Sequence, residues 1–148
     1  MVKIKNRLRM AFDSRPENVG LARVAVAAFA SQLDFTVSEL DDIKGAVSEA
    51  VSNAIIHGYR ERSGETVRLD AILTEHGLEV MVEDEGEGIQ DVTQAQVPGF
   101  TSTPERLGLG FAFMESFMDT VEVISAPGQG TRVRLTKRIE RGEHARAH

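Results

Sequence analysis

The chain has 148 residues, of which 41% are hydrophobic and 27% are charged, and its formal net charge is −6 at pH 7. This length predicts one domain, because a chain of this size buries roughly 68–70% of its unfolded surface in a single core. The composition excludes a disordered or collagen-like chain, and the acidic balance argues against direct nucleic-acid binding over a broad surface. The absence of cysteine excludes disulfides, thiolate zinc sites and a cysteine nucleophile.

Targeting and metal signals are weak in this sequence. No apolar run reaches about 18 residues, and no continuous apolar stretch follows the basic N-terminal residues, so we expect no membrane span, no signal peptide and a cytoplasmic location. His57 and His76 lack metal-ligand spacing, and His144 and His148 lie in a charged tail. We therefore expect no histidine-based metal site.

The first predicted elements are a strand and a helix. Residues 3–12 alternate between basic and mostly apolar side chains, which is the period of a half-buried strand. An Ala/Val-rich run at 19–33 then predicts a helix. Ser14 and Glu17 match a capping box ahead of it, with Pro16 tolerated because first-turn amides have no helical partner.

A second, longer helix follows, and two strands come after it. Thr36 and Glu39 repeat the capping-box pattern, and apolar residues then recur at helical spacing until Gly58. Residues 67–73 and 78–82 alternate between apolar and polar side chains. This alternation predicts two antiparallel strands joined by a short turn.

The C-terminal part begins with a long segment in which apolar residues do not recur at helix or strand spacing. Residues 85–110 carry glycines and proline and exceed the usual loop length, which favours a functional lid. A short helix at about 110–118 and strands at about 120–125 and 131–137 complete the order. We expect residues 138–148 to form a charged, disordered tail.

This order of elements predicts an α+β fold in one domain over residues 1–137. The expected architecture is a two-layer sandwich, in which helices cover one face of a mixed, mostly antiparallel sheet. The sequence contains no internal repeat and no low-complexity segment that would indicate a second unit.

Glu49 and Asn53 form the first candidate site. A spacing of four residues places both side chains on one face of the second helix, pointing away from its apolar side. A carboxylate and an amide on a polar helix face can act on a ligand, but the same pair also fits an ordinary solvated surface. Because the pattern is so short, the pattern alone favours the solvated surface.

Asp84, Gly86 and Gly88 directly follow the predicted strand at 78–82. A carboxylate at a strand end can accept a hydrogen bond from an exocyclic amine, and the two glycines let the backbone approach a flat ligand closely. An acidic surface turn is an equally good interpretation. A calcium-binding loop is a weak alternative, because its twelfth position requires Glu and is Ala95 here.

Arg106, Gly108 and Gly110 lie where the predicted lid meets the following helix. Backbone amides at a helix N-terminus bind anions, and an adjacent Arg adds a charged fork for phosphate. The segment is not a dinucleotide-binding fingerprint, because it follows a loop instead of a strand, and no Walker lysine is present. Gly130 and Thr131 most simply belong to a hairpin turn.

In this order the four motifs resemble the ATP-binding boxes of the Bergerat-fold superfamily of gyrase, Hsp90, histidine kinases and MutL. The similarity extends to Ala22-Arg23-Val24, to residues 47–59 and to residues 110–119, which resemble the anti-sigma-factor serine kinases and, among them, the sporulation branch. It covers roughly residues 5–137. The resemblance implies a Bergerat fold with an ATP lid.

The resemblance also implies ATP and Mg²⁺ as cofactors. It implies that Asn53 ligates Mg²⁺, which agrees with the preference of this ion for few protein oxygens together with phosphates and water. It implies that Asp84 accepts a hydrogen bond from the adenine amine. The other ATP-binding residues that it implies are Gly86, Gly88, Arg106, Gly108, Gly110 and Thr131.

Catalysis and partners follow from the same resemblance. Glu49 would draw the proton from a serine hydroxyl of an anti-anti-sigma protein. Arg23 would contact that protein and a sporulation sigma factor alternately, and the family implies a homodimer. Three alternatives stay open: a general-stress-type anti-sigma kinase, a non-catalytic ATP-gated module that binds sigma, and a detached histidine-kinase catalytic domain.

Overall fold

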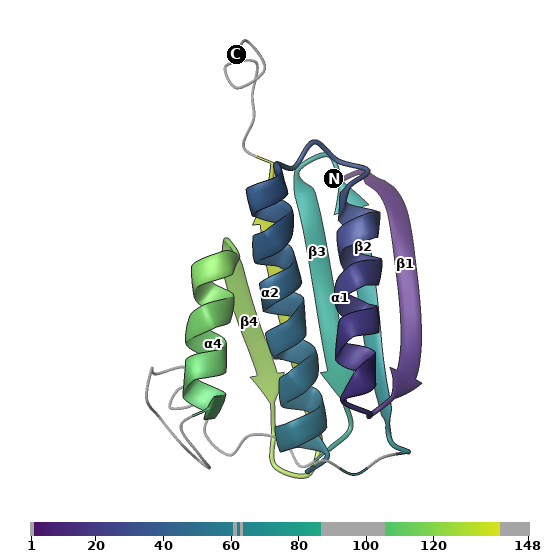
Figure 1. Cartoon of the computed structure of the whole chain (residues 1–148), viewed down its shortest axis with the longest axis vertical. Helices are drawn as coiled ribbons and strands as arrows, with labels where there is room; N and C mark the ends of the chain where they lie inside the picture. Colours follow the sequence, from purple (N-terminus) through teal and green to yellow (C-terminus); the bar gives the residue numbers. More distant parts are fainter. Residues whose placement is uncertain (1, 61, 63, 87–105, 140–148) are drawn as a thin grey trace.

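The computed structural model describes residues 2–60, 62, 64–86 and 106–139, except for the side chains of residues 106–109. Within these residues the elements follow the predicted order of strands and helices (Figure 1). They are β1 (Ile4–Asp13), α1 (Glu17–Ala30), α2 (Val37–Asn53), the π-helix η1 (Ala54–Gly58), β2 (Thr66–Thr74), β3 (Gly77–Asp84), α4 (Arg106–Phe117), β4 (Thr120–Ser125) and β5 (Thr131–Arg138).

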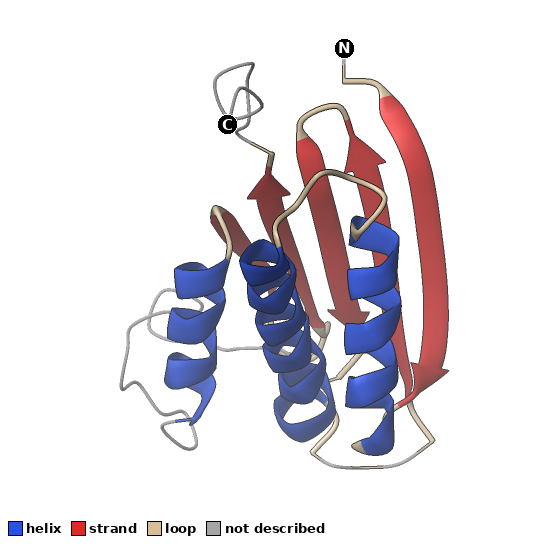
Figure 2. Cartoon of the chain, turned by 45° about the horizontal axis from the view of Figure 1, so that its top comes forward, coloured by secondary structure: helices blue, strands red, loops and turns tan. Residues whose placement is uncertain are grey.

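The strands form one five-stranded sheet with the order β1-β2-β3-β5-β4. All four neighbouring pairs are antiparallel, so the expected mixed sheet is antiparallel throughout. The helices lie together on one face of this sheet (Figure 2). The predicted two-layer α+β sandwich is therefore confirmed, and α2 lies between α1 and α4 (Figure 1).

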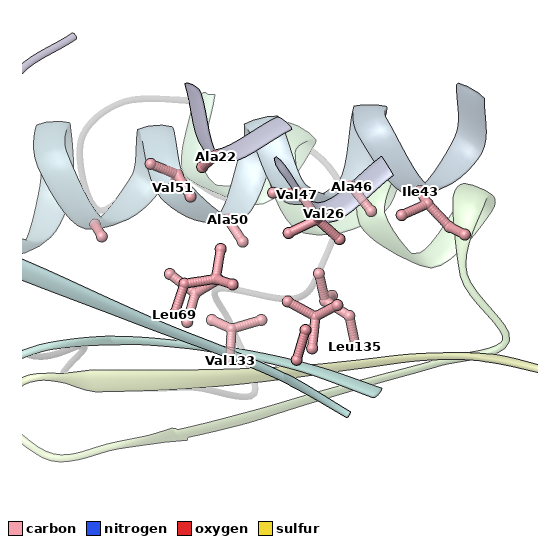
Figure 3. Packing of buried hydrophobic residues seen from close by; sticks show 14 of the residues in the cluster. Ala22, Val26, Ile43, Ala46, Val47, Ala50, Val51, Leu69, Val133 and Leu135 are labelled. Atoms are coloured by element: carbon pink, nitrogen blue, oxygen red, sulfur yellow. The ribbon is translucent and has the colours of Figure 1, made fainter. Parts of the chain in front are cut away.

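The core lies between the helix layer and the sheet (Figure 3). Helical spacing turns one apolar face of α1 and α2 inward, and strand alternation turns every second side chain of the sheet toward it. Burying a large apolar side chain stabilises the fold by roughly 1.5–3 kcal/mol, so this layer carries most of the stability. The buried residues shown include Ala22, Val26, Ile43, Val47, Val51, Leu69, Val133 and Leu135.

The start of α2 agrees with its predicted capping box. The Thr36 side chain accepts a hydrogen bond from the Glu39 backbone N–H at 3.0 Å, and the Glu39 carboxylate accepts one from the Thr36 N–H at 2.8 Å. These two bonds satisfy amides that a helix start otherwise leaves unpaired. They fix the residue at which α2 begins, and helical spacing from there determines the face on which Glu49 and Asn53 lie.

The predicted capping box of α1 is wrong. Its helix begins at Glu17 and ends at Ala30, and the N-cap residue is Pro16, which makes no side-chain capping bond. Ser14 is fully buried and instead donates a hydrogen bond to the Arg62 carbonyl at 2.5 Å. A partner that lies 48 residues away in the sequence replaced the local one.

The C-terminal elements match the prediction except at two boundaries. Helix α4 begins at Arg106, four residues before the predicted start, and β5 continues through Arg138. The Ile139 N–H then donates to the His76 carbonyl at 2.8 Å. Most of the predicted lid and residues 140–148 of the predicted tail lie outside the described residues. Among the helices that are described, none combines the length and apolar composition that a bilayer crossing requires.

Candidate functional site

Glu49 and Asn53 line one cavity of about 280 Å³. His57 lies four residues beyond Asn53, on η1, and lines the same cavity, while Gly110 and Phe113 of α4 form another part of its wall. The predicted direction of Glu49 and Asn53, away from the apolar side of α2, is confirmed by this arrangement. Sequence reasoning did not select His57 for the site, although its spacing of four from Asn53 continues the same helix face.

Gly110 brings α4 close to the functional face of α2. A Cβ atom at this position would lie 3.1 Å from Asn53 Nδ2 and 3.2 Å from Glu49 Oε2. Both contacts are tighter than ordinary packing, so any larger residue would press on the two polar side chains. Gly108 lies in the first turn of α4, where helix amides lack helical partners, and its role toward a phosphate stays a prediction.

Asn53 carries an unsatisfied polar atom. Its Nδ2 is buried, and the described part of the chain offers it no hydrogen-bond partner. Such a group costs roughly 1–3 kcal/mol, and buried polar groups are almost always paired. An unpaired amide on a cavity wall therefore favours a ligand that supplies the missing partner.

The residues around Asn53 fit a Mg²⁺ ion that arrives with its own ligands. The described residues contain no group of three or more His, Cys, Asp and Glu side chains that could hold a metal ion. Mg²⁺ is commonly bound through one or two protein oxygens together with phosphates and water. The Asn53 amide can supply one oxygen of this kind, so the donor set fits a phosphate-bound ion and not a cage made by the protein alone.

Asp84 forms a second part of the candidate site, at the end of β3. It is only 5% exposed, and its Oδ1 accepts a hydrogen bond from the Gly86 N–H at 2.9 Å. Burial raises the pKa of Asp84 to about 6, and hydrogen bonds from the Gly86 and Thr131 backbones offset only part of that effect. Thr131 lies opposite Asp84 in the β3–β5 pairing, and its role beside adenine stays a prediction. Its hydroxyl lies 2.8 Å from that of Ser125.

Three glycines pack against Asp84 and the residues next to it. A Cβ atom at Gly58 would lie 2.6 Å from Asp84 Oδ1, and one at Gly86 would lie 1.9 Å from the Gly58 carbonyl oxygen. At Gly130, whose φ is +79°, it would lie 2.1 Å from the Asp84 carbonyl oxygen. At Gly86 and Gly130 no other residue fits without a backbone shift, and at Gly58 a side chain would displace the Asp84 carboxylate. The sequence marked Gly58 only as a helix end, so its role beside Asp84 was missed.

The remaining predicted site residues are not all brought together. Gly88 and the Arg106 side chain lie outside the described residues. Arg23 is exposed on α1, and α1 lies on the side of α2 opposite to α4 (Figure 1). Arg23 is therefore on a different helix from the cavity wall that Gly110 and Phe113 form.

Comparisons with known proteins agree with this fold. A family model described as a histidine kinase-like ATPase domain matches residues 12–137. The anti-sigma F factor of Oceanobacillus iheyensis is 48% identical over 142 residues, which cover 95% of this chain and 97% of that protein. The anti-sigma F factor of Pasteuria penetrans is 51% identical over 139 residues, with 92% and 93% covered.

Solved structures of the same fold are more distant in sequence. The crystal structure of the RsbU and RsbW domains of Rv1364c from Mycobacterium tuberculosis matches with a TM-score of 0.68 and 22% identity. The match covers 93% of this chain and 34% of that one. The histidine kinase domain from Erythrobacter litoralis EL346 matches with a TM-score of 0.54 and 22% identity, over 81% of this chain and 58% of that one. At such identities the likeness shows the fold alone.

Proposed function

The chain belongs to the anti-sigma F factor family and carries a histidine kinase-like ATPase domain, and from this premise we propose that it is a Mg-ATP-dependent protein serine kinase and a sporulation anti-sigma factor. It binds and inhibits a sporulation sigma factor in the cytoplasm, and it phosphorylates and thereby inactivates an anti-anti-sigma protein. The observation that carries the proposal is the cavity in which Glu49 lies beside the unpaired amide of Asn53.

The nucleotide is proposed to lie between the two parts of the candidate site. Asp84 accepts a hydrogen bond from the adenine amine, with Thr131 beside it, because a buried carboxylate at a strand end is an acceptor that selects an amine. The phosphates lie toward Asn53. The backbone at Gly86 and Gly88 passes the nucleotide, and Arg106 and the first-turn amide of Gly108 contact phosphate. Gly110, whose amide lies inside α4, leaves room for the nucleotide beside Asn53.

Asn53 would hold Mg²⁺ through its amide oxygen. When bound, the ion neutralises charge on the phosphate oxygens during transfer. Asn53 Nδ2, which has no partner among the described residues, can donate separately to a phosphate oxygen of the nucleotide. The rest of the rate acceleration comes from positioning, because phosphoryl transfer needs little covalent chemistry from the protein.

Glu49 acts as the general base in this proposal. The serine hydroxyl oxygen of the substrate protein forms a bond to the γ-phosphorus of ATP, and the bond from that phosphorus to the bridging oxygen breaks, so that ADP leaves. The Glu49 carboxylate takes the proton of the hydroxyl group. Such a role is typically worth roughly 10²–10⁴-fold in rate.

Arg23 is proposed to bind the sigma factor and the anti-anti-sigma protein in turn. Its exposure on α1 supports this role, because either protein can reach it from solvent. Both proteins contact the same residue, so they compete. The active form is proposed to be a homodimer.

A transfer assay tests the proposed activity. Labelled γ-phosphate in Mg-ATP is offered to the purified chain together with a candidate anti-anti-sigma protein encoded beside it, and the modified residue is identified by mass spectrometry. The proposal predicts label on a serine. Label on a histidine would instead identify a detached histidine-kinase domain. ATP-dependent binding of the partner without any label would reduce the chain to a nucleotide-gated binding module.

A further inference from the structure

Tyr59 directly follows η1 and is almost completely buried. Its hydroxyl donates a hydrogen bond to the Thr66 carbonyl at 2.7 Å and accepts one from the Glu85 N–H at 2.7 Å. The same oxygen therefore bridges the first residue of β2 and the residue that follows Asp84. Both bonds have good hydrogen-bond length, and both partners are backbone groups that are fixed in position.

The bond to Glu85 bears directly on Asp84. Two amides follow this residue, and the Asp84 carboxylate accepts the second of them, from Gly86, at 2.9 Å. The first, from Glu85, is held by Tyr59. Two hydrogen bonds thus hold the turn after β3, one from Gly86 to the Asp84 carboxylate and one from Glu85 to Tyr59.

Burial raises the pKa of Tyr59, and the nearby charges of Asp84 and Glu85 act in the same direction. The hydroxyl therefore keeps its proton at neutral pH and continues to donate to Thr66. A neutral phenol is also the form that can donate and accept at once. The bridge is therefore intact at neutral pH.

We propose that Tyr59 is a positioning residue for base recognition, whose hydroxyl holds the Asp84 carboxylate in the direction that selects a purine with a 6-amino group over one with a 6-oxo group. The proposal rests on the proposed binding of adenine at Asp84. It adds a residue that does not touch the base itself and acts through the turn after β3. It predicts a loss of selectivity, and not only a loss of stability, when the hydroxyl is removed.

The first test compares ATP with inosine triphosphate, which has the same phosphates and sugar but carries an oxygen at position 6. The ratio of the two dissociation constants, measured by calorimetry, cancels effects at the phosphate and metal end of the site. We expect the wild-type chain to favour ATP by at least about tenfold. In Tyr59→Phe, which keeps the ring and removes only the hydroxyl, this ratio should fall by at least about threefold.

Ser14→Ala provides a matched control. The Ser14 hydroxyl is also fully buried and also bridges two backbone groups, since it donates to the Arg62 carbonyl and accepts from the Glu65 N–H. Neither partner belongs to the turn after β3. Its removal should lower stability by a similar amount and leave the ATP-to-inosine ratio unchanged.

The outcomes distinguish the role of Tyr59 from the assignment of Asp84 to adenine. A wild-type chain that favours ATP, with the same preference in Tyr59→Phe, overturns the role of Tyr59 and leaves the adenine assignment intact. A wild-type chain with no preference removes the assignment of Asp84, and the Tyr59 proposal falls with it. A reduced ratio in Tyr59→Phe together with an unchanged ratio in Ser14→Ala supports the proposal.

A second measurement needs no variant. Tyr59 is the single tyrosine of the chain, so fluorotyrosine incorporation gives one fluorine resonance that reports on this residue alone. Saturating ATP should move that resonance more than saturating inosine triphosphate does, because only the amine engages the Asp84 turn. Equal shifts for the two nucleotides, or no shift with ATP, would overturn the proposal even if Tyr59→Phe failed to fold.

Discussion

The two ends of the candidate site differ in how far the chain completes them by itself. Around Asp84, close glycine contacts and a tyrosine hydroxyl leave the turn fixed. Around Asn53 there is instead a cavity, and a buried amide has no partner among the described residues. The first end is built during folding, whereas the second requires a ligand to complete its hydrogen bonding.

This difference separates the expected effects of substitution. Changes near Asp84 should alter folding and base selectivity, because that end is packed without spare space. Changes near Asn53 should alter ligand binding and leave folding nearly intact, since the chain gains little from that side chain. Preorganising one end in this way also reduces the ordering that binding must achieve.

The largest expected effect on stability comes from Gly130→Ala. Gly128 is the matched control, because its φ of +78° is nearly the same as the +79° of Gly130 and no atom of the described residues lies within 4 Å of a Cβ there. Both substitutions carry the same backbone strain, but only Gly130→Ala drives a Cβ into the Asp84 carbonyl. We expect it to lower the free energy of urea unfolding by about 1–3 kcal/mol more than Gly128→Ala does. Equal losses would show that the Asp84 end is not tightly packed.

At the other end, Asn53→Ala should weaken Mg-dependent ATP binding by roughly 10- to 100-fold, since hydrogen bonds to charged groups are worth about 1.5–3 kcal/mol. The melting temperature without ligand should not fall, because the variant removes an unsatisfied buried amide. Calorimetry with and without Mg²⁺ measures the first effect, and thermal unfolding measures the second. Normal affinity in a folded variant contradicts the metal assignment.

Asp84→Asn tests the proposed hydrogen bond between Asp84 and the adenine amine. The ionised carboxylate only accepts, whereas an amide also donates to a 6-oxo group. The preference for ATP over inosine triphosphate should therefore decrease or invert in this variant. An unchanged preference in the competition assay would remove Asp84 from the pocket.

The pH dependence of Asp84 gives a related prediction. Its pKa in the folded chain is raised from 3.8 to about 6, so between these values the folded state binds more protons than the unfolded state. The contribution of Asp84 to stability therefore decreases as pH rises through this window, and Asp84→Asn should lack that decrease. In the same window, ionisation should increase the preference for ATP over inosine triphosphate. Urea titrations of both chains at several pH values test the first statement.

The smallest effect on either end is expected from Arg23→Ala. Because the residue is exposed, unfolding should change by less than about 0.5 kcal/mol, and ATP affinity should not change. Sigma-factor binding should weaken roughly tenfold. Arg9→Ala, which removes the same charge from exposed β1, serves as the control in the binding assay. Equal losses in the two variants would indicate a general charge effect instead of a contact at Arg23.

The sequence predicted those features that local patterns determine. The capping box at Thr36 and the spacing along α2 placed Glu49 and Asn53 on one face, and strand alternation placed Asp84 at the end of β3. The start of α1 was mispredicted because the partners of Ser14 lie at Arg62 and Glu65, which no local pattern reveals.

The contacts around Asp84 also could not be predicted from local sequence patterns. Tyr59 and Glu85 are 26 residues apart, and the contact of Gly58 with Asp84 spans a similar separation. A single sequence carries no signal for such close approaches. The start of α4 was placed too late for another reason, since a segment rich in glycine has weak helix propensity and tertiary packing decides its boundary.

The most direct test of the account is the single-turnover rate of phosphoryl transfer by Glu49→Gln. This variant preserves the size of the side chain and removes its ability to take a proton. We predict that transfer to the anti-anti-sigma serine slows by roughly 10²–10⁴-fold, while the dissociation constant of Mg-ATP stays within about twofold of the wild-type value. An unchanged transfer rate would contradict the role of Glu49 as general base, as would a loss explained entirely by weaker ATP binding.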